Sequence, residues 1–291
     1  MGYRRVGVPV GGAFDSGALD LANAMLGNPP DAAALELTLV GGSYQAEADL
    51  AITLTGAPME ATVEPESGPT RRWSIPQTGT LRNGETLILR GSNLGARTYL
   101  AVRGGWRTPI VLGSRSTETP SRAGDRFPAE PGTTSTRRPS PEIIEAFGSG
   151  RGFGDPIRWV DGPDFDTSLR QDWFLGHYRV LEQSNRVGVR LEGASISVPN
   201  DPSRLSRPVA PGAIQVAGDH PILLGVAGGT IGGYPHVGHV ISADIDQVAQ
   251  LRPGTIVRFE RVSLTEARRV DAERRRIRAV WRTRLAIWGG V

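Results

Sequence analysis

Glycine and proline constrain this chain more than any other feature of its sequence. The 291 residues include 38 Gly and 22 Pro, about a fifth of the chain. Both residue types interrupt long helices and favour turns, so this abundance predicts many short strands joined by tight turns. A hydrophobic content of 38% and a charged content of 22% are those of an ordinary globular protein. We therefore expect a mainly β protein with few helices.

Two residue types are absent from the chain, and their absence excludes several chemistries. There is no Cys, and all 33 Lys+Arg residues are arginine. Without lysine the chain cannot carry covalent biotin, a Schiff base or pyridoxal phosphate. Without cysteine it has no thiolate nucleophile and no zinc–thiolate site. The net charge of +3 is also uneven, because residues 266–291 hold eight Arg against three acidic residues.

The apolar pattern predicts one early helix and a series of strands. Asp15 or Ser16 can cap a helix over residues 15–27, and Gly27 can end it. The expected strands cover residues 35–40, 50–55, 86–90, 98–103, 157–160, 178–182, 187–191, 213–216, 221–226, 237–242 and 256–261. A short helix is expected at 244–251. The Pro- and Ser-rich residues 119–141 predict a long loop.

This pattern suggests one domain over residues 1–265, with two β-rich lobes at about 1–140 and 155–265. Residues 264–288 carry apolar side chains at near-helical spacing, with Arg on the other faces, so an Arg-rich C-terminal helix is expected over 266–291. We favour a docked terminal helix with a solvated face. Contact with another protein chain, nucleic-acid contact and an anionic membrane surface are the alternatives. Neither a nucleic acid nor a membrane is expected as a partner.

No stretch approaches the roughly 18 apolar residues of a membrane helix, and no signal peptide opens the sequence. A cytoplasmic location is therefore expected.

The glycine-rich run 225–233 is interpreted either as a turn between barrel strands or as a wall that a ligand approaches closely. The loop 113–117 combines hydroxyls with one arginine and could bind an anion. His236 and His239 lie three residues apart without a third ligand, so no metal site is expected.

Four segments, read in order, resemble one family. They are residues 7–36, 103–117, 184–193 and 212–259, the last of which contains Gly-Gly-Tyr-Pro. Together they resemble the KipA family of biotin-dependent carboxyltransferase subunits over about residues 2–267. Its members include the C subunit of bacterial 5-oxoprolinase, allophanate hydrolase subunit 2-like proteins and part of the carboxyltransferase region of urea carboxylase.

The resemblance implies a cyclophilin-like β-barrel architecture and a multi-subunit enzyme. In 5-oxoprolinase, such chains work with a KipI-like B subunit and an A subunit. That complex couples ATP hydrolysis to the opening of 5-oxo-L-proline to glutamate. The carboxyltransferase relatives move a carboxyl group between biotin and an amide-like substrate. Both chemistries require polarisation of an amide carbonyl and donors for an oxyanion.

The resemblance also implies which positions contact a small amide or lactam. In the first motif these are Asn28 and Glu36, and in the second Arg115 and Ser116 would bind a carboxylate or phosphate. The opposite wall would be lined by Gln215, Thr230, Gly232, Gly233, Tyr234 and His236. No catalytic residue is assigned.

The chain departs from the family pattern at positions that bear on activity. The usual D-R-Q-T-T before Gly-Gly-Tyr-Pro is Ala-Gly-Gly-Thr-Ile at residues 227–231, and the Asp of S-D-R-M-G is Asn185. Loss of an Asp removes a base or a charge partner. Family members also usually begin earlier, with an additional strand, which leaves open whether the N-terminus is truncated.

Three functions follow from these observations. The first is the C subunit of an ATP-dependent, 5-oxoprolinase-like hydrolase. ATP would bind in that complex, either on this chain or on another subunit. The second is a catalytically degenerate regulatory protein that pairs with a KipI-like protein. The third is a carboxyltransferase domain for an amide substrate, for which biotin must arrive on another chain.

Overall fold

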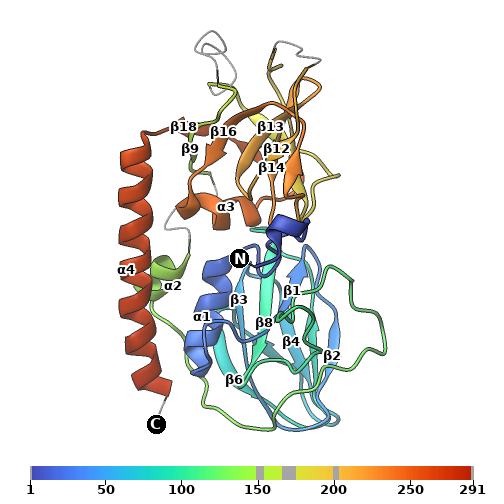
Figure 1. The fold of residues 1–291 in the computed structure, drawn as a ribbon. Helices are drawn as coiled ribbons and strands as arrows, with labels where there is room; N and C mark the ends of the chain where they lie inside the picture. Colours follow the sequence, from blue (N-terminus) through green and yellow to red (C-terminus); the bar gives the residue numbers. More distant parts are fainter. Residues whose placement is uncertain (1, 149–153, 166–174, 199–202, 290–291) are drawn as a thin grey trace. The chain divides into compact units, whose positions relative to one another are not determined.

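A computed structural model describes residues 2–148, 154–165, 175–198 and 203–289. The chain divides into two compact units. The first unit comprises Met1–Phe14 and Arg151–Arg275, and the second comprises Asp15–Gly150 and Arg276–Val291. Each unit is built mainly from β strands (Figure 1), which confirms the expected fold class.

The second unit contains two four-stranded sheets. One has the strand order β1-β8-β3-β6 and the other β2-β7-β4-β5. Their bounds are β1 Leu35–Thr38, β2 Ser43–Gln45, β3 Leu50–Gly56, β4 Ala61–Glu64, β5 Arg71–Trp73, β6 Gln77–Leu81, β7 Thr86–Leu89 and β8 Arg97–Val102. Side chains from both sheets, such as Leu54 and Leu87, join one buried apolar cluster. The two sheets therefore share a core, as in a β-sandwich.

The predicted first helix is present in the second unit as α1, Ser16–Leu26, and it packs on β3 and β8. Its N-terminus is capped by Asp15, whose side chain accepts a 2.9 Å hydrogen bond from the Ala18 N–H. Its C-terminus ends at Gly27, which adopts the left-handed conformation (φ 71°) that glycine tolerates best. Both boundaries were readable from sequence because capping is a local interaction.

The first unit is built on a single eight-stranded sheet with the order β17-β10-β11-β14-β13-β16-β9-β18. The bounds are β9 Ile157–Asp161, β10 Tyr178–Val180, β11 Gly188–Glu192, β13 Ala213–Ala217, β14 His220–Leu224, β16 His236–Val240, β17 Ile256–Val257 and β18 Phe259–Arg261. Only Arg258 separates the two edge strands in sequence. The edges must therefore meet, and the sheet curls into a nearly closed barrel.

This closure explains why the expected strand 256–261 is two strands. Its first part pairs with β10 and its second part pairs with β9, on opposite edges of the sheet. Inside the barrel, Trp159, Tyr178 and Leu191 are almost fully buried and belong to one apolar cluster. The expected helix at 244–251 is present as η3, Ser242–Asp244, followed by α3, Ile245–Ala249.

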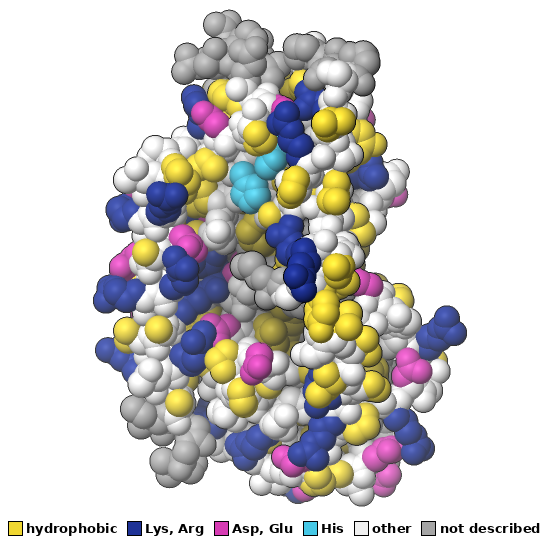
Figure 2. All heavy atoms as spheres, in the orientation of Figure 1, with side chains coloured by type: hydrophobic (Ala, Val, Ile, Leu, Met, Phe, Trp, Pro, Cys, Tyr) yellow, Lys and Arg dark blue, Asp and Glu magenta, His cyan; other side chains and the backbone are white. Residues whose placement is uncertain are grey.

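The predicted C-terminal helix is present as α4, Leu264–Gly289. In the first unit Ala267 packs with Ile241. In the second unit Leu285 packs with Phe147, at the end of helix α2, Pro141–Phe147. Figure 2 shows arginine and acidic side chains interspersed over the surface of α4. Within the described ranges, no helix is both long and apolar enough to cross a membrane.

Candidate functional site

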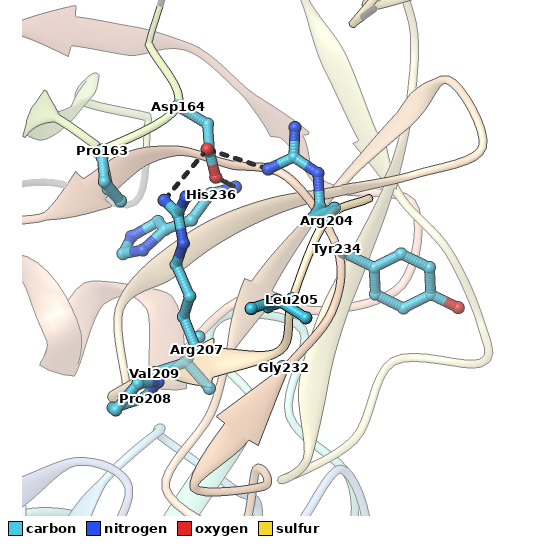
Figure 3. Close-up of a pocket in the computed structure, with 10 residues that line it drawn as sticks. All are labelled: Pro163, Asp164, Arg204, Leu205, Arg207, Pro208, Val209, Gly232, Tyr234 and His236. Atoms are coloured by element: carbon cyan, nitrogen blue, oxygen red, sulfur yellow. Dashed lines mark hydrogen bonds and ion pairs between the residues drawn. The ribbon is translucent and has the colours of Figure 1, made fainter. Parts of the chain in front are cut away.

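A cavity of about 240 Å³ lies in the first unit, beside the turn that follows β9 (Figure 3). Three segments contribute its lining residues, which are Pro163, Asp164, Arg204, Leu205, Arg207, Pro208, Val209, Gly232, Tyr234 and His236. The volume is below the roughly 300–1,000 Å³ typical of pockets for drug-sized ligands. The cavity therefore suits a smaller molecule.

The turn after β9 is held tightly against the start of β16. The Asp164 backbone N–H donates to the His236 carbonyl at 3.1 Å, and the Asp164 carboxylate accepts from the His236 N–H at 2.8 Å. A Cβ on Gly162 would lie 2.3 Å from that carbonyl oxygen. Only glycine permits this approach. The Asp-Gly-Pro-Asp sequence at 161–164 thus positions the Asp164 carboxylate in the cavity.

A short ribbon supplies the facing side of the cavity. It consists of β12, Arg207–Pro208, and β15, Ile231–Gly232, which pair antiparallel with Arg207 opposite Gly232. The glycine-rich run 225–233 therefore contains a strand as well as a turn. In Figure 3 the Arg204 and Arg207 side chains both point toward Asp164, whereas the Tyr234 ring points away from it.

The two arginines hold the Asp164 carboxylate unequally. Nη1 of Arg204 lies 2.8 Å from Oδ1, and the Arg204 side chain is 17% exposed. Nη1 of Arg207 lies 3.4 Å from the same oxygen, and the Arg207 side chain is 58% exposed. Two cations against one anion leave the cavity with an excess of one positive charge.

The protonation states of the neighbouring groups follow from burial and charge. Burial opposes ionisation of Asp164, but the His236 N–H and the two guanidiniums outweigh it and hold the pKa of that carboxyl below its ordinary value. Burial lowers the pKa of His236, so its imidazole is neutral near pH 7. Burial and the adjacent His236 lower the pKa of His239 to about 4. In the part of the chain that the structure describes, no group of three or more His, Asp or Glu could hold a metal ion.

The structure brings several predicted site residues to this cavity. Gly232, Tyr234 and His236 line it directly. Gln215 is buried beneath them and donates to the Tyr234 carbonyl at 3.5 Å. The register of β13 against β16 shifts between Ile214 and Gln215, which is a β-bulge of the kind that re-aims side chains near binding sites.

Two more predicted residues, Thr230 and Gly233, lie within two residues of Gly232 in the sequence. The Thr230 carbonyl accepts a 3.0 Å hydrogen bond from the Val209 N–H, which extends the β12–β15 ribbon. A Cβ on Gly233 would lie 3.4 Å from Ser206 Oγ, an ordinary contact. Their direct roles in substrate binding stay predictions.

Asn28 and Glu36 belong to the second unit and make structural contacts there. The Asn28 amide donates to the Val102 carbonyl at 2.8 Å and its oxygen accepts from the Gly104 N–H at 2.8 Å. One Glu36 oxygen accepts from Tyr99 Oη at 2.7 Å and the other pairs with Arg97 Nε at 3.2 Å. These polar atoms stabilise the sheet, and substrate contact by Asn28 or Glu36 stays a prediction.

Arg115 and Ser116 lie on an exposed loop of the second unit. The Arg115 guanidinium donates to the Thr108 carbonyl, and the Ser116 N–H donates to Ser114 Oγ at 3.0 Å. The loop therefore presents both residues to solvent, and their predicted role in anion binding remains a prediction.

The three charged residues of the cavity, Asp164, Arg204 and Arg207, were not predicted from the sequence. The first follows a Gly-Pro turn after an apolar strand, and the arginines are three residues apart before a proline. Each signal is common in surface loops. Only the strand register, which places these segments together, distinguishes them as a site.

Comparison with known proteins defines the class of this fold. A carboxyltransferase domain family, described as subdomain A and B, matches residues 6–261. The chain is 34% identical to the C subunit of 5-oxoprolinase from Escherichia coli, covering 97% of this chain and 92% of that protein. It is 27% identical to urea amidolyase of Saccharomyces cerevisiae, covering 92% of this chain and 16% of that protein.

Solved structures agree with the sequence comparisons. The urea amidolyase of K. lactis superposes with a TM-score of 0.80 at 26% identity, over 96% of this chain and 18% of that chain. TTHA0988 superposes with a TM-score of 0.73 at 29% identity, over 89% of this chain and 52% of that chain. This chain thus spans about half the length of TTHA0988. It belongs to the carboxyltransferase domain family, which confirms the resemblance drawn from four segments.

Proposed function

We propose that this chain is the C subunit of a 5-oxoprolinase-like complex that opens 5-oxo-L-proline to glutamate with the energy of ATP hydrolysis. The observation that carries the proposal is sequence similarity. The chain is 34% identical to the C subunit of 5-oxoprolinase from Escherichia coli and 27% identical to urea amidolyase of Saccharomyces cerevisiae. A KipI-like B subunit and an A subunit would complete the enzyme.

The cavity supports this proposal chemically. Its volume suits a small lactam, and its charge excess suits an anionic one. His236 contributes a neutral imidazole whose Nε2 is buried with no hydrogen-bond partner among the described residues. A neutral imidazole can accept or donate a proton near pH 7. His236 is therefore the residue of this cavity best suited to assist amide opening.

ATP is a poor fit to this cavity. A triphosphate nucleotide is much larger than the small-molecule space of about 240 Å³, and the arginines there already pair with Asp164. In this proposal ATP binds elsewhere in the complex. Covalent biotin has no attachment point on this chain because it contains no lysine.

Reconstitution tests the proposal. The purified chain is combined with a KipI-like B subunit and an A subunit of the 5-oxoprolinase type, and glutamate and ADP are measured with 5-oxo-L-proline. We expect turnover only when all three proteins are present. Omission of this chain and replacement of 5-oxo-L-proline by 2-pyrrolidinone are the controls. No turnover in any combination contradicts the proposal.

A regulatory role is the second candidate, and the glycine-rich run favours it. A Cβ on Gly228, where the family usually has Arg, would lie 2.6 Å from Leu224 Cγ and 2.9 Å from the Val187 carbonyl oxygen. This position therefore has no room for the arginine side chain usual in the family. Stable co-purification with a KipI-like partner, without turnover, would support this role. A carboxyltransferase role would instead require binding of a biotinylated carrier.

A further inference from the structure

One of the two guanidiniums in the cavity is only weakly paired with Asp164. Asp164 neutralises one guanidinium, and the 2.8 Å contact and low exposure of Arg204 identify that partner. Arg207 reaches the same oxygen only at 3.4 Å and is 58% exposed. An ion pair with so exposed a guanidinium contributes little to stability. Arg207 can therefore exchange Asp164 for another anion at little cost.

The surroundings of Arg207 fit one kind of anion. Leu205, Pro208 and Val209 present apolar surface beside the guanidinium. The Arg4 guanidinium donates to the Val209 carbonyl and adds positive charge to the same wall. A guanidinium binds a planar carboxylate through two parallel hydrogen bonds. An apolar wall next to it favours a carboxylate on a compact hydrocarbon or ring body.

We infer that this cavity binds a small organic monoanion, with Arg207 recognising its carboxylate and the Arg204–Asp164 pair holding the wall behind it. This inference deepens the proposed function, because it names the group by which the site selects its ligand. It depends on the proposed function only in that 5-oxo-L-proline is chosen as one probe. Asp164 keeps its bonds to Arg204 and to the His236 N–H when Arg207 turns to the ligand.

Three ring compounds of similar size separate the features that matter. 5-Oxo-L-proline carries a carboxylate and an amide, cyclopentanecarboxylate carries only the carboxylate, and 2-pyrrolidinone carries only the amide. Dissociation constants are measured for the full chain by ligand-observed NMR. We expect both carboxylates to bind about tenfold or more tightly than 2-pyrrolidinone, since a charge-assisted hydrogen bond is lost in the neutral compound.

Variants at two exposed arginines of the same unit locate the binding. Arg207→Gln should weaken both carboxylates about tenfold or more and leave 2-pyrrolidinone unchanged. Arg207→Lys should retain part of the affinity, because it keeps the charge and loses the planar fork. Arg179→Gln, on β10 and outside the cavity lining, is the matched control and should bind like the native chain. Circular dichroism verifies that each variant is folded.

The outcomes distinguish this inference from the proposed function. Binding of cyclopentanecarboxylate but not of 5-oxo-L-proline, with loss in Arg207→Gln, supports the inference and counts against the proposed substrate. Equal affinity of Arg207→Gln and the native chain for both carboxylates overturns the inference. So does binding of neither carboxylate, whatever the reconstituted complex does with ATP.

Discussion

Gly232 and Gly233 are adjacent in the sequence, but a side chain at each position would have different neighbours. A Cβ on Gly232 would lie 2.5 Å from Gln215 Nε2 and 3.3 Å from Val209 Cγ1, both buried neighbours. A Cβ on Gly233 would meet only Ser206 Oγ at 3.4 Å. At residue scale, the Gly-Gly pair therefore contains one crowded position, Gly232, and one open position, Gly233.

Substitution by alanine should separate the two glycines. Gly232→Ala pushes the buried Gln215 amide away from the Tyr234 carbonyl and should cost about 1–3 kcal/mol, the usual cost of overpacking. Gly233→Ala should change the free energy of unfolding by less than about 0.5 kcal/mol. Urea unfolding followed by tryptophan fluorescence measures both. Equal costs at the two positions would refute the crowding at position 232.

His239 makes stability depend on pH. Burial lowers its pKa from 6.5 to about 4 in the folded chain. Between these values the unfolded chain binds more protons, so this contribution is fully present above about pH 6.5 and is lost as the pH falls toward 4. At pH 5 the loss should be about 2 kcal/mol, since one pKa unit corresponds to about 1.4 kcal/mol.

Replacement of His239 should remove that part of the acid sensitivity. Between pH 7.5 and pH 5 the native chain should lose about 2 kcal/mol more unfolding free energy than His239→Gln. His220→Gln is the control, because that side chain is 42% exposed. Parallel pH profiles for the native chain and His239→Gln would show that the buried imidazole is not responsible.

At the scale of elements, β9 carries two bidentate ion pairs that differ in burial. Arg158 binds Asp244 through contacts of 3.0 and 2.6 Å, and the Asp244 side chain is fully buried in η3. Arg261 of β18 binds Asp161 with similar geometry, but the two side chains are 34% and 42% exposed. The buried pair fixes η3 against the barrel, whereas the exposed pair lies in solvent.

Removing the carboxylates should reveal this difference. Asp244→Ala leaves Arg158 largely buried without its partner and should cost about 3–5 kcal/mol. Asp161→Ala removes a solvated pair and should cost less than about 1 kcal/mol. Chemical denaturation of the two variants gives both values. A cost for Asp161→Ala as large as for Asp244→Ala would contradict the assignment.

At the scale of the whole molecule, the chain order does not follow the division into units. Residues 1–14 join the barrel unit although residues 15–150 form the other unit, and α4 contributes residues to both. The buried clusters nevertheless stay separate, because Trp159 and Leu191 belong to one and Leu54 and Leu87 to another.

The separate cores predict a local response to a change in α4. Leu285 is 7% exposed and packs with Leu21 and Phe147, so Leu285→Ala should cost about 2–5 kcal/mol. Hydrogen-exchange protection should fall in α1 and α2 and persist in the barrel strands β11, β13 and β14. Val280→Ala, at a 41% exposed position of the same helix, is the control. Equal loss of protection in the barrel would refute independent cores.

Several elements could be predicted because their signals are local. Asp15 and Gly27 mark the ends of α1, and apolar spacing marks α4. Strands β4, β5 and β6 were not predicted, because residues such as Thr62, Arg72 and Gly79 interrupt their apolar pattern. These strands form because they pair with neighbours: β4 lies between β5 and β7, and β6 pairs with β3.

The sequence by itself determined the mainly β class, the two clearest helices and membership of the carboxyltransferase family. Glycine and proline at turns, helix caps and ordered motifs are all local features, so they can be recognised without a structure. Only the tertiary structure decided the site. Asp164, Arg207 and His236 come from three distant segments, and the register of β16 with its neighbours and the pairing of β12 with β15 bring them together. A single sequence does not show such non-local pairing, and the cavity depends on it.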